Sequence, residues 1–220
     1  MALRNAGWLT FVSKYFIYYS QLIPMPRTGL SKEESRQLIL EKADELFRRY
    51  GVGKTTIADI AGDLRMSPAN IYKFFPSKNA IVQACAGENI RKLKTLVLSK
   101  VRGSGSAFER LENVVLTVFH FQHELLRNER QIFHIVQTAR EEAWPCIADY
   151  DTFIVGVFHQ LIEEGIRTGE FRKDLPPDSA TILRDCVNVL LHPHHRREFR
   201  PDESDAHVRA QLRFLRRALE

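Results

Sequence analysis

The sequence predicts an all-α fold of nine helices over the residues that follow position 30. Apolar residues recur there at intervals of three or four, which aligns them along one side of an α-helix. Residues that cap or end helices stand at the borders of these segments. No alternating apolar and polar run lies between Asn-Gly or Asp-Gly turn signals, so the sequence gives no sign of β-strands.

The first helix is expected between Ser31 and Gly51. Ser31 is followed three residues later by Glu34, and this pair predicts a capping box at the start of the helix. Gly51 is suited to end it. The apolar stripe of the helix includes Leu38, Ile39, Ala43, Leu46, Phe47 and Tyr50.

Two short helices are expected next. The first runs from Thr56 to Asp63 or Leu64. Ser67 and Pro68 read as an N-cap followed by a proline in the first turn, which predicts a second short helix to about residue 74.

Longer helices fill the rest of the chain. Ser77 is expected to cap a helix that runs to about Val101, where Gly103-Ser104-Gly105 interrupts it. Five more helices are expected at roughly 106–127, 129–141, 146–168, 178–191 and 203–219.

Residues 1–26 form an N-terminal extension that stands apart from this pattern. Apolar residues at helical spacing within it indicate an extra helix packed on the body. Alternatively, translation begins naturally at Met25, and the first 24 residues are a start-site artefact. Lys14 interrupts the apolar run and no small-residue cleavage site follows, which argues against a signal peptide.

Composition and charge narrow the class of protein. The 220 residues are 44% hydrophobic and 27% charged, typical of a globular chain, and no apolar run is long enough to span a membrane. Three widely spaced cysteines suit a reducing cytoplasm. The net charge of +5 lies entirely in the N-terminal 80 residues, since residues 81–220 are neutral. This placement is expected if the N-terminal end meets phosphate.

Residues 56–75 have the pattern of a helix-turn-helix. The first helix has an apolar face, Met66 is expected to be the buried residue of the turn, and Ile71 and Phe75 anchor the second helix. The residues left facing outward are small or polar, as entry into a DNA major groove about 12 Å wide requires. They are Pro68, Ala69, Asn70 and Lys73.

Residues 35–80 resemble the DNA-binding half of the TetR family of bacterial regulators. The matching residues are Ala43, Leu46-Phe47, Gly51, Thr55-Thr56, Ile60-Ala61, Ser67, Ile71-Tyr72, Phe75 and Ser77-Lys78. Arg65-Met66 replaces the family's usual Gly-Val at the turn, and Lys73-Phe74 replaces its usual aromatic pair. Further on, Gly165 and Gly169-Glu170-Phe171 resemble the close of the family's seventh helix.

The resemblance implies a TetR-like fold with two domains and a role in transcription. Residues 27–78 would form the DNA-binding domain, and residues 79–220 a ligand-binding and dimerisation domain. We expect a cytoplasmic, ligand-responsive repressor that binds a palindromic operator as a homodimer and is released by a small-molecule inducer. A TetR-like activator or global regulator without a ligand is the alternative. A helical enzyme or scaffold is a third reading, disfavoured because no catalytic set stands out.

The resemblance also implies DNA contacts, residue by residue. Tyr72 and Lys78 would meet backbone phosphate, where the helix that Lys78 begins also attracts anions. Thr56 and Ser67 would cap helices, contact phosphate, or do both. Asn70 could read adenine bidentately. Lys73 would reach guanine or phosphate or stay solvated, and Lys54 would contact phosphate or be merely exposed.

The larger domain is expected to hold the effector and to dimerise. An aromatic-rich set with a few polar partners has the composition of a ligand pocket, although ordinary core packing must be the explanation for most of these residues. This set is Phe119, His123, Phe133, Gln137, Trp144, Tyr150 and Phe153. The last two long helices would form an intersubunit four-helix bundle through Ile182, Cys186, Val189, Val208, Leu212 and Leu215. The His192, His194 and His195 cluster lacks completing ligands, so we expect no metal and no cofactor.

Overall fold

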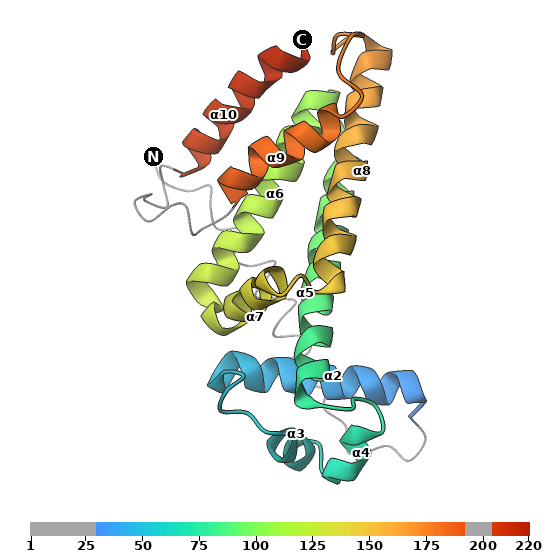
Figure 1. Cartoon of the computed structure of the whole chain (residues 1–220), viewed down its shortest axis with the longest axis vertical. Helices are drawn as coiled ribbons and strands as arrows, with labels where there is room; N and C mark the ends of the chain where they lie inside the picture. The colour runs from blue at the N-terminus through green and yellow to red at the C-terminus, as the bar shows by residue number, and fades with distance from the viewer. Residues whose placement is uncertain (1–29, 192–203) are drawn as a thin grey trace.

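The computed structural model describes residues 30–191 and 204–220, and these residues form nine α-helices without a β-strand (Figure 1). The all-α fold predicted from the sequence is thereby confirmed. The N-terminal extension with its two interpretations, and the His192 to His195 cluster, lie outside the described residues.

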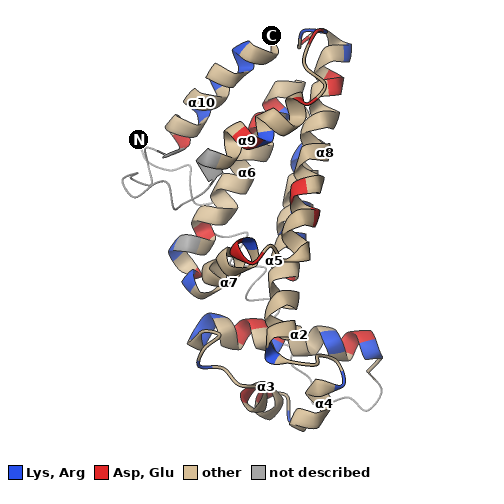
Figure 2. Cartoon of the chain, in the orientation of Figure 1, with Lys and Arg blue, Asp and Glu red and all other residues tan. Residues whose placement is uncertain are grey.

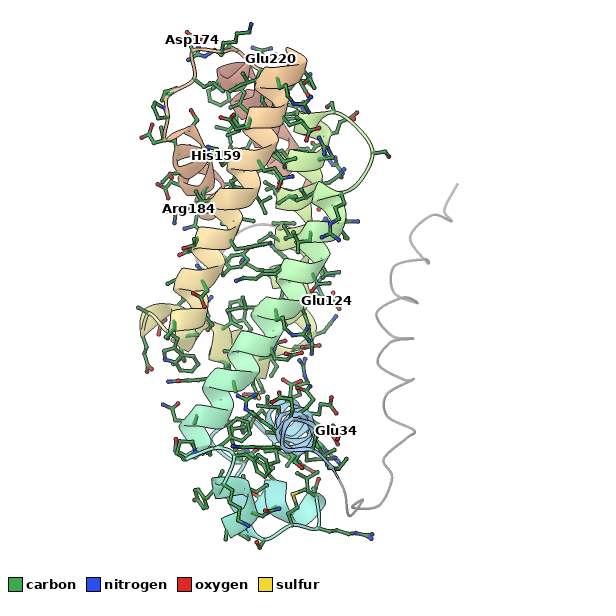
Figure 3. All side chains as sticks on the ribbon, turned by 90° about the vertical axis from the view of Figure 1, so that its right-hand side faces the viewer. Glu34, Glu124, His159, Asp174, Arg184 and Glu220 are labelled. Atoms are coloured by element: carbon green, nitrogen blue, oxygen red, sulfur yellow. The ribbon has the colours of Figure 1, made fainter. Side chains whose placement is uncertain are left out.

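Three helices form the base of the molecule, namely α2 (Lys32–Tyr50), α3 (Ile57–Asp63) and α4 (Pro68–Tyr72). From this base α5 (Lys78–Val101) rises into a larger body. The body also contains α6 (Ala107–Asn128), α7 (Arg130–Glu141), α8 (Pro145–Thr168), α9 (Ser179–Leu191) and α10 (Ser204–Leu219). Figure 3 places Glu34 of α2 in the lower part of the elongated molecule and Glu220 at its opposite end.

The predicted helix caps form as expected. The Ser31 hydroxyl accepts from the backbone N–H of Glu34 at 3.1 Å, and the Glu34 carboxylate accepts from the Ser31 N–H at 2.8 Å. Ser77 caps α5 by accepting from the Ala80 N–H at 3.1 Å. Because these bonds use groups within three residues of each other, they were visible in the sequence.

A continuous apolar core joins the base to the body. In the base, Ile39, Phe47 and Ile60 are completely buried, and in the body Leu111 and Leu161 are. The helix α5 links the two regions, since it contacts α2 below and α6 and α8 above. Each such side chain contributes about 1.5–3 kcal/mol through burial, so the base is held firmly to the body.

The end of α8 shows why its glycines are needed. A Cβ at Gly165 would lie 2.1 Å from the ring of Phe171, so only glycine lets that ring pack against the helix. Gly169 has a φ of +78°, in the left-handed region. The Glu170 carboxylate then accepts from the N–H groups of Ala107 and Phe108, at 2.8 and 3.1 Å, and so caps α6.

Candidate functional site

The short helix α4 is anchored on one side and open on the other. Ile71 and Phe75 are buried, and the guanidinium of Arg36 lies 4.8 Å from the centre of the Phe75 ring. Met66, expected to be buried in the turn, is only half-buried, although it still packs against the core. The anchoring fixes which face of α4 is presented to solvent.

The turn between α3 and α4 departs from the expected residue but not from the expected geometry. Arg65 has a φ of +52°, a left-handed conformation that glycine adopts without strain. The N–H of Arg65 donates to the Gly62 carbonyl at 3.0 Å, and that of Met66 to the Ala61 carbonyl at 2.8 Å. These two bonds form a Schellman motif, so the turn is made with arginine where glycine would be easier.

The outward face of α4 carries small and polar groups. Pro68, Ala69 and Lys73 are exposed, and 52% of Tyr72 is exposed. Within the described part of the chain, the side chains of Asn70, Tyr72 and Lys73 have no hydrogen-bond partner. The helix itself contains no charged residue, as its uniform tan colour in Figure 2 shows.

The hydroxyl groups of Thr56 and Ser67 both cap helices. Thr56 accepts from the backbone N–H of Asp59 at 3.1 Å and donates to its carboxylate at 2.7 Å, which lowers the pKa of Asp59. Ser67 accepts from the backbone N–H of Asn70 at 3.2 Å. Both residues lie on the surface beside α4, so capping leaves them exposed to a partner.

Lys78 is partly committed inside the protein. Its ammonium donates to the carbonyl of Val52 at 2.6 Å and to that of Thr55 at 2.8 Å. These bonds tie the start of α5 to the loop that leads into α3. An ammonium has three N–H donors, so one remains for another partner. Lys54, in the same loop, is exposed.

A charged cluster connects the base with the body. Arg48 of α2 donates to Asp44 at 2.7 Å and to the side-chain oxygen of Asn89 in α5 at 3.3 Å. Arg48 also forms an ion pair with Glu129, which lies between α6 and α7. Only 15% of the Arg48 side chain is exposed, so this residue links α2, α5 and the junction of α6 and α7 in a largely buried setting.

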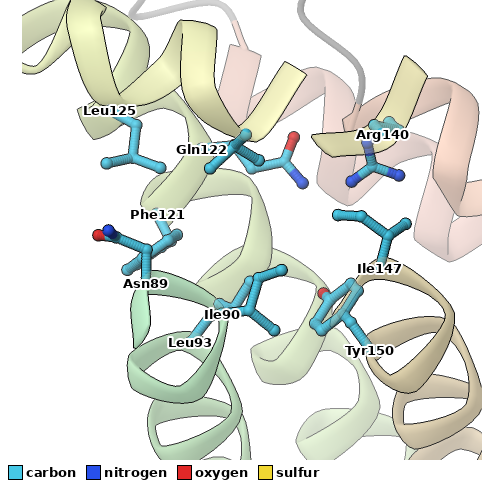
Figure 4. A pocket seen from close by; sticks show the side chains of 10 residues that line it. Asn89, Ile90, Leu93, Phe121, Gln122, Leu125, Arg140, Ile147 and Tyr150 are labelled. Atoms are coloured by element: carbon cyan, nitrogen blue, oxygen red, sulfur yellow. The ribbon is translucent and has the colours of Figure 1, made fainter. Parts of the chain in front are cut away.

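The body contains a cavity of about 30 Å³ between α5, α6, α7 and α8 (Figure 4). This volume is enough for about two water molecules. Its lining consists of Asn89, Ile90, Leu93, Phe121, Gln122, Leu125, Val136, Arg140, Ile147 and Tyr150. Asn89 belongs both to this lining and to the Arg48 cluster.

Of the seven residues predicted to line a pocket, Tyr150 alone belongs to the lining of this cavity. Phe119, Phe133 and Trp144 are buried in the core, whereas His123, Gln137 and Phe153 are partly buried elsewhere. Sequence reasoning did not select Arg140. The available signal was its position four residues after Val136, which puts a charge on the apolar side of α7.

The predicted dimer residues fall into two groups. Ile182 is 47% exposed on α9, Cys186 is exposed beside it, and Leu215 of α10 is half-buried. Val208 and Leu212 are completely buried, because α10 packs this apolar stripe against α6 of the same chain. The expectation that they form an intersubunit surface is therefore corrected. The side chain of Val189 lies outside the description.

The described residues contain no group of three or more histidine, cysteine or acidic side chains placed to hold a metal ion. None of the described helices combines the length and the apolar character that crossing a membrane requires.

Comparison with known families covers most of the chain. The family model described as "Bacterial regulatory proteins, tetR family" matches residues 39–85. A second model, "Tetracyclin repressor-like, C-terminal domain", matches residues 107–210. The first match includes the turn and α4, and the second includes most of the body.

Individual relatives support the same grouping. The HTH-type transcriptional repressor KstR2 of Mycolicibacterium smegmatis is 26% identical over 76% of this chain and 82% of its own length. A transcriptional regulator from Cytophaga hutchinsonii shares the fold with a TM-score of 0.66 at 20% identity, over 84% of this chain and 98% of that one. A Saccharomonospora viridis transcriptional regulator solved in complex with choline is 26% identical, with a TM-score of 0.59 over 83% and 97%.

Proposed function

Because the chain belongs to the TetR family of bacterial transcriptional regulators, we propose that it is a repressor that binds a palindromic operator as a homodimer and is released by a small-molecule inducer. Members of this family are DNA-binding regulators. The name of the relative KstR2 supports repression as the sign of regulation.

The outward face of α4 is the observation that carries this proposal. Its small residues allow close approach to the floor of a major groove, and Asn70 has a free amide that matches the donor and acceptor of adenine. Tyr72 and Lys73 follow on the same short helix and its end, where they could reach phosphate. Thr56, Ser67, Lys54 and the third N–H of Lys78 would add phosphate contacts around it.

A dimer would present two copies of α4 to successive grooves. We place its surface on the outer sides of α9 and α10, where Ile182, Cys186 and Leu215 are joined by Phe214, which is 78% exposed. Exposed apolar residues that together form a patch indicate an interaction surface. Val208 and Leu212 take no part in this surface.

The Arg48 cluster is our proposed link between effector and DNA. It ties α2, which supports α3 and α4, to Asn89 at the edge of the cavity and to Glu129 beside α7. A ligand that moved α7 or Asn89 would change these bonds. It would thereby favour a different orientation of α2, α3 and α4 relative to the body. Ligand binding would in this way change the affinity of the dimer for DNA.

The test is DNA binding to the upstream region of the protein's own gene. The purified chain should retard this fragment at low salt, and rising salt should release it, as phosphate contacts require. Failure to retard the fragment at low salt would count heavily against the proposal. A reporter fused to the same region should become more active when the gene is deleted.

A second candidate is a regulator that works without a ligand, and the cavity volume favours it. Space for about two water molecules does not accommodate an inducer without rearrangement. This candidate keeps the DNA contacts and loses the release step. Stabilisation of the protein by a small molecule, together with release from DNA, would exclude it.

A further inference from the structure

One end of the cavity is polar although its walls are apolar. Five aliphatic side chains and Phe121 form the walls, drawn from α5, α6, α7 and α8. Figure 4 shows the polar ends of Gln122, Arg140 and Tyr150 turned toward the same space. An apolar chamber with a few converging polar groups is the usual form of a small-molecule site.

The hydroxyl of Tyr150 is buried without a hydrogen-bond partner. Only 6% of the residue is exposed, and burial raises the pKa of the phenol, so it stays neutral and can donate a proton in a hydrogen bond. Leaving such a group unsatisfied is costly, because its bonds to water are lost and not replaced. The hydroxyl can therefore donate a hydrogen bond to an acceptor that a ligand brings into the cavity.

The half-buried guanidinium of Arg140 is a second polar group that faces this space. Across the described residues it has neither a hydrogen-bond acceptor nor an ion-pair partner. Burial lowers its pKa, against the weaker opposing effects of Asp151 and Tyr150, yet an arginine keeps its charge in proteins. Arg140 is half-buried, so burial removes part of the hydration of its charge, and a carboxylate or several hydrogen bonds would compensate that loss.

We propose that the cavity binds a small organic acid, with its carboxylate held by Arg140 and Tyr150 and its apolar body against Ile90, Leu93 and Ile147. The two N–H groups of a guanidinium match the two oxygens of a carboxylate, and the phenol adds a third bond. Gln122 supplies an amide N–H beside them. This names the effector class, and so it rests on the proposed function.

The charge of Arg140 also sets this cavity apart from a choline site. The Saccharomonospora viridis relative was solved with choline, which is a cation. A cation would be repelled by the guanidinium, whereas a carboxylate is attracted to it. We therefore expect this chain to discriminate against choline.

The small volume makes binding and movement inseparable. Little room is left between the lining side chains, so an acid of the size of octanoate would displace some of them as it binds. Since α7 contacts α2 directly, and Asn89 accepts a bond from Arg48, this movement reaches the base of the molecule. Filling the cavity would thus disturb the cluster that holds α2.

The experiment measures the melting temperature of the full chain with matched probes at millimolar concentration. Octanoate and 4-phenylbutyrate are compared with their uncharged amides, octanamide and 4-phenylbutyramide, and with choline. At least one acid should raise the melting temperature, and its amide and choline should not. An equal rise with acid and amide, or no rise with either acid, would overturn the proposal.

Two variants and a control locate the effect. R140M should weaken acid binding roughly ten- to hundredfold, and Tyr150→Phe roughly two- to tenfold, as expected for charged and neutral hydrogen bonds. Without acid, Tyr150→Phe should melt at or above the temperature of the natural protein, because it loses an unsatisfied buried hydroxyl, and R140M should melt close to that temperature, because Arg140 is only half-buried. Arg130→Met, on the exposed side of α7, should bind as before. Unchanged acid binding in both cavity variants would overturn the proposal.

DNA retardation with the same acid separates this inference from the proposed function. Acid-specific stabilisation that depends on Arg140 supports the ligand class whether or not DNA is released. Stabilisation without release would instead contradict the inducer role in the proposed function.

Discussion

The face of α4 and the cavity differ in how the chain builds them. On α4, polar groups stand free in water, where an absent partner costs little, and neighbours in sequence hold them in place. In the cavity, polar groups from three different helices meet among apolar side chains, and the buried hydroxyl of Tyr150 lacks a hydrogen-bond partner within the described residues. The polar groups of α4 cost the free protein little, whereas the unsatisfied hydroxyl in the cavity lowers its stability until a ligand binds.

We therefore expect a substitution in the core of the body to lower the stability of the whole protein, whereas substitutions on the surface of the base should have local effects. Leu212→Asp should lower the free energy of unfolding by about 3–5 kcal/mol, because it places an uncompensated charge in the core. Urea denaturation measures the loss. Phe214→Asp, at an exposed position two residues further on, should leave the protomer folded and instead weaken the dimer, because Phe214 lies on the proposed dimer surface. A Leu212→Asp protein as stable as the natural one, but monomeric by light scattering, would return Leu212 to the dimer surface.

Lys78 and Lys54 differ in their contacts within the base, since Lys78 bonds two backbone carbonyls and Lys54 is exposed. Lys78→Met removes two bonds from an ammonium to carbonyls, so the free energy of unfolding should fall by about 1.5–3 kcal/mol. In Lys54→Met this energy should not change, since the residue is exposed. Both variants should reduce the slope of log K against log salt by about one unit if each lysine meets one phosphate. An unchanged slope for Lys78→Met would limit Lys78 to holding the loop.

Tyr72→Phe tests a contact that exists only with DNA. The hydroxyl has no partner within the described residues, so the variant should fold with unchanged stability. Its DNA affinity should fall about two- to tenfold on every sequence, because a phosphate contact positions the protein without reading bases. Titration of operator and unrelated DNA side by side would show this, and a loss confined to the operator would contradict it.

Arg65→Gly gives the smallest expected effect. The left-handed turn strains an arginine but not a glycine, so the variant should gain about 0.5–1 kcal/mol, reduced by the greater freedom of glycine in the unfolded chain. Thermal unfolding provides the measurement. A clear loss of stability would mean that contacts of the Arg65 side chain outweigh the backbone strain.

How much could be predicted from the sequence follows the same division. Caps such as Ser31 and Ser67 act over three residues, so the helices and the open face of α4 could be predicted. The apolar stripe of α10 was visible too, but a stripe does not reveal which surface covers it, and Leu212 was assigned to the partner. The meeting of Arg140 with Tyr150 depends on packing between α7 and α8, which no local pattern contains.

The positive φ of Arg65 is a case in which the structure does not follow the local preference of the residue. The sequence has arginine where the turn would favour glycine, yet the turn keeps the geometry that a glycine would favour. Ile71 and Phe75 on one side and Ile60 on the other are buried in the common core. Their burial outweighs a strain of about 1–2 kcal/mol at one residue. Tertiary packing therefore overrides local preference at this position.

The most direct test of the account is selection of binding sites from random DNA by the natural protein and by Asn70→Ala. The natural protein should enrich an inverted repeat with two equivalent half-sites. Asn70→Ala should keep the spacing and lose its preference at one base pair in each half-site, a change of about 1–3 kcal/mol. If the natural protein enriches no sequence, or both proteins select the same repeat with the same preferences, then Asn70 and the face of α4 do not read DNA as proposed.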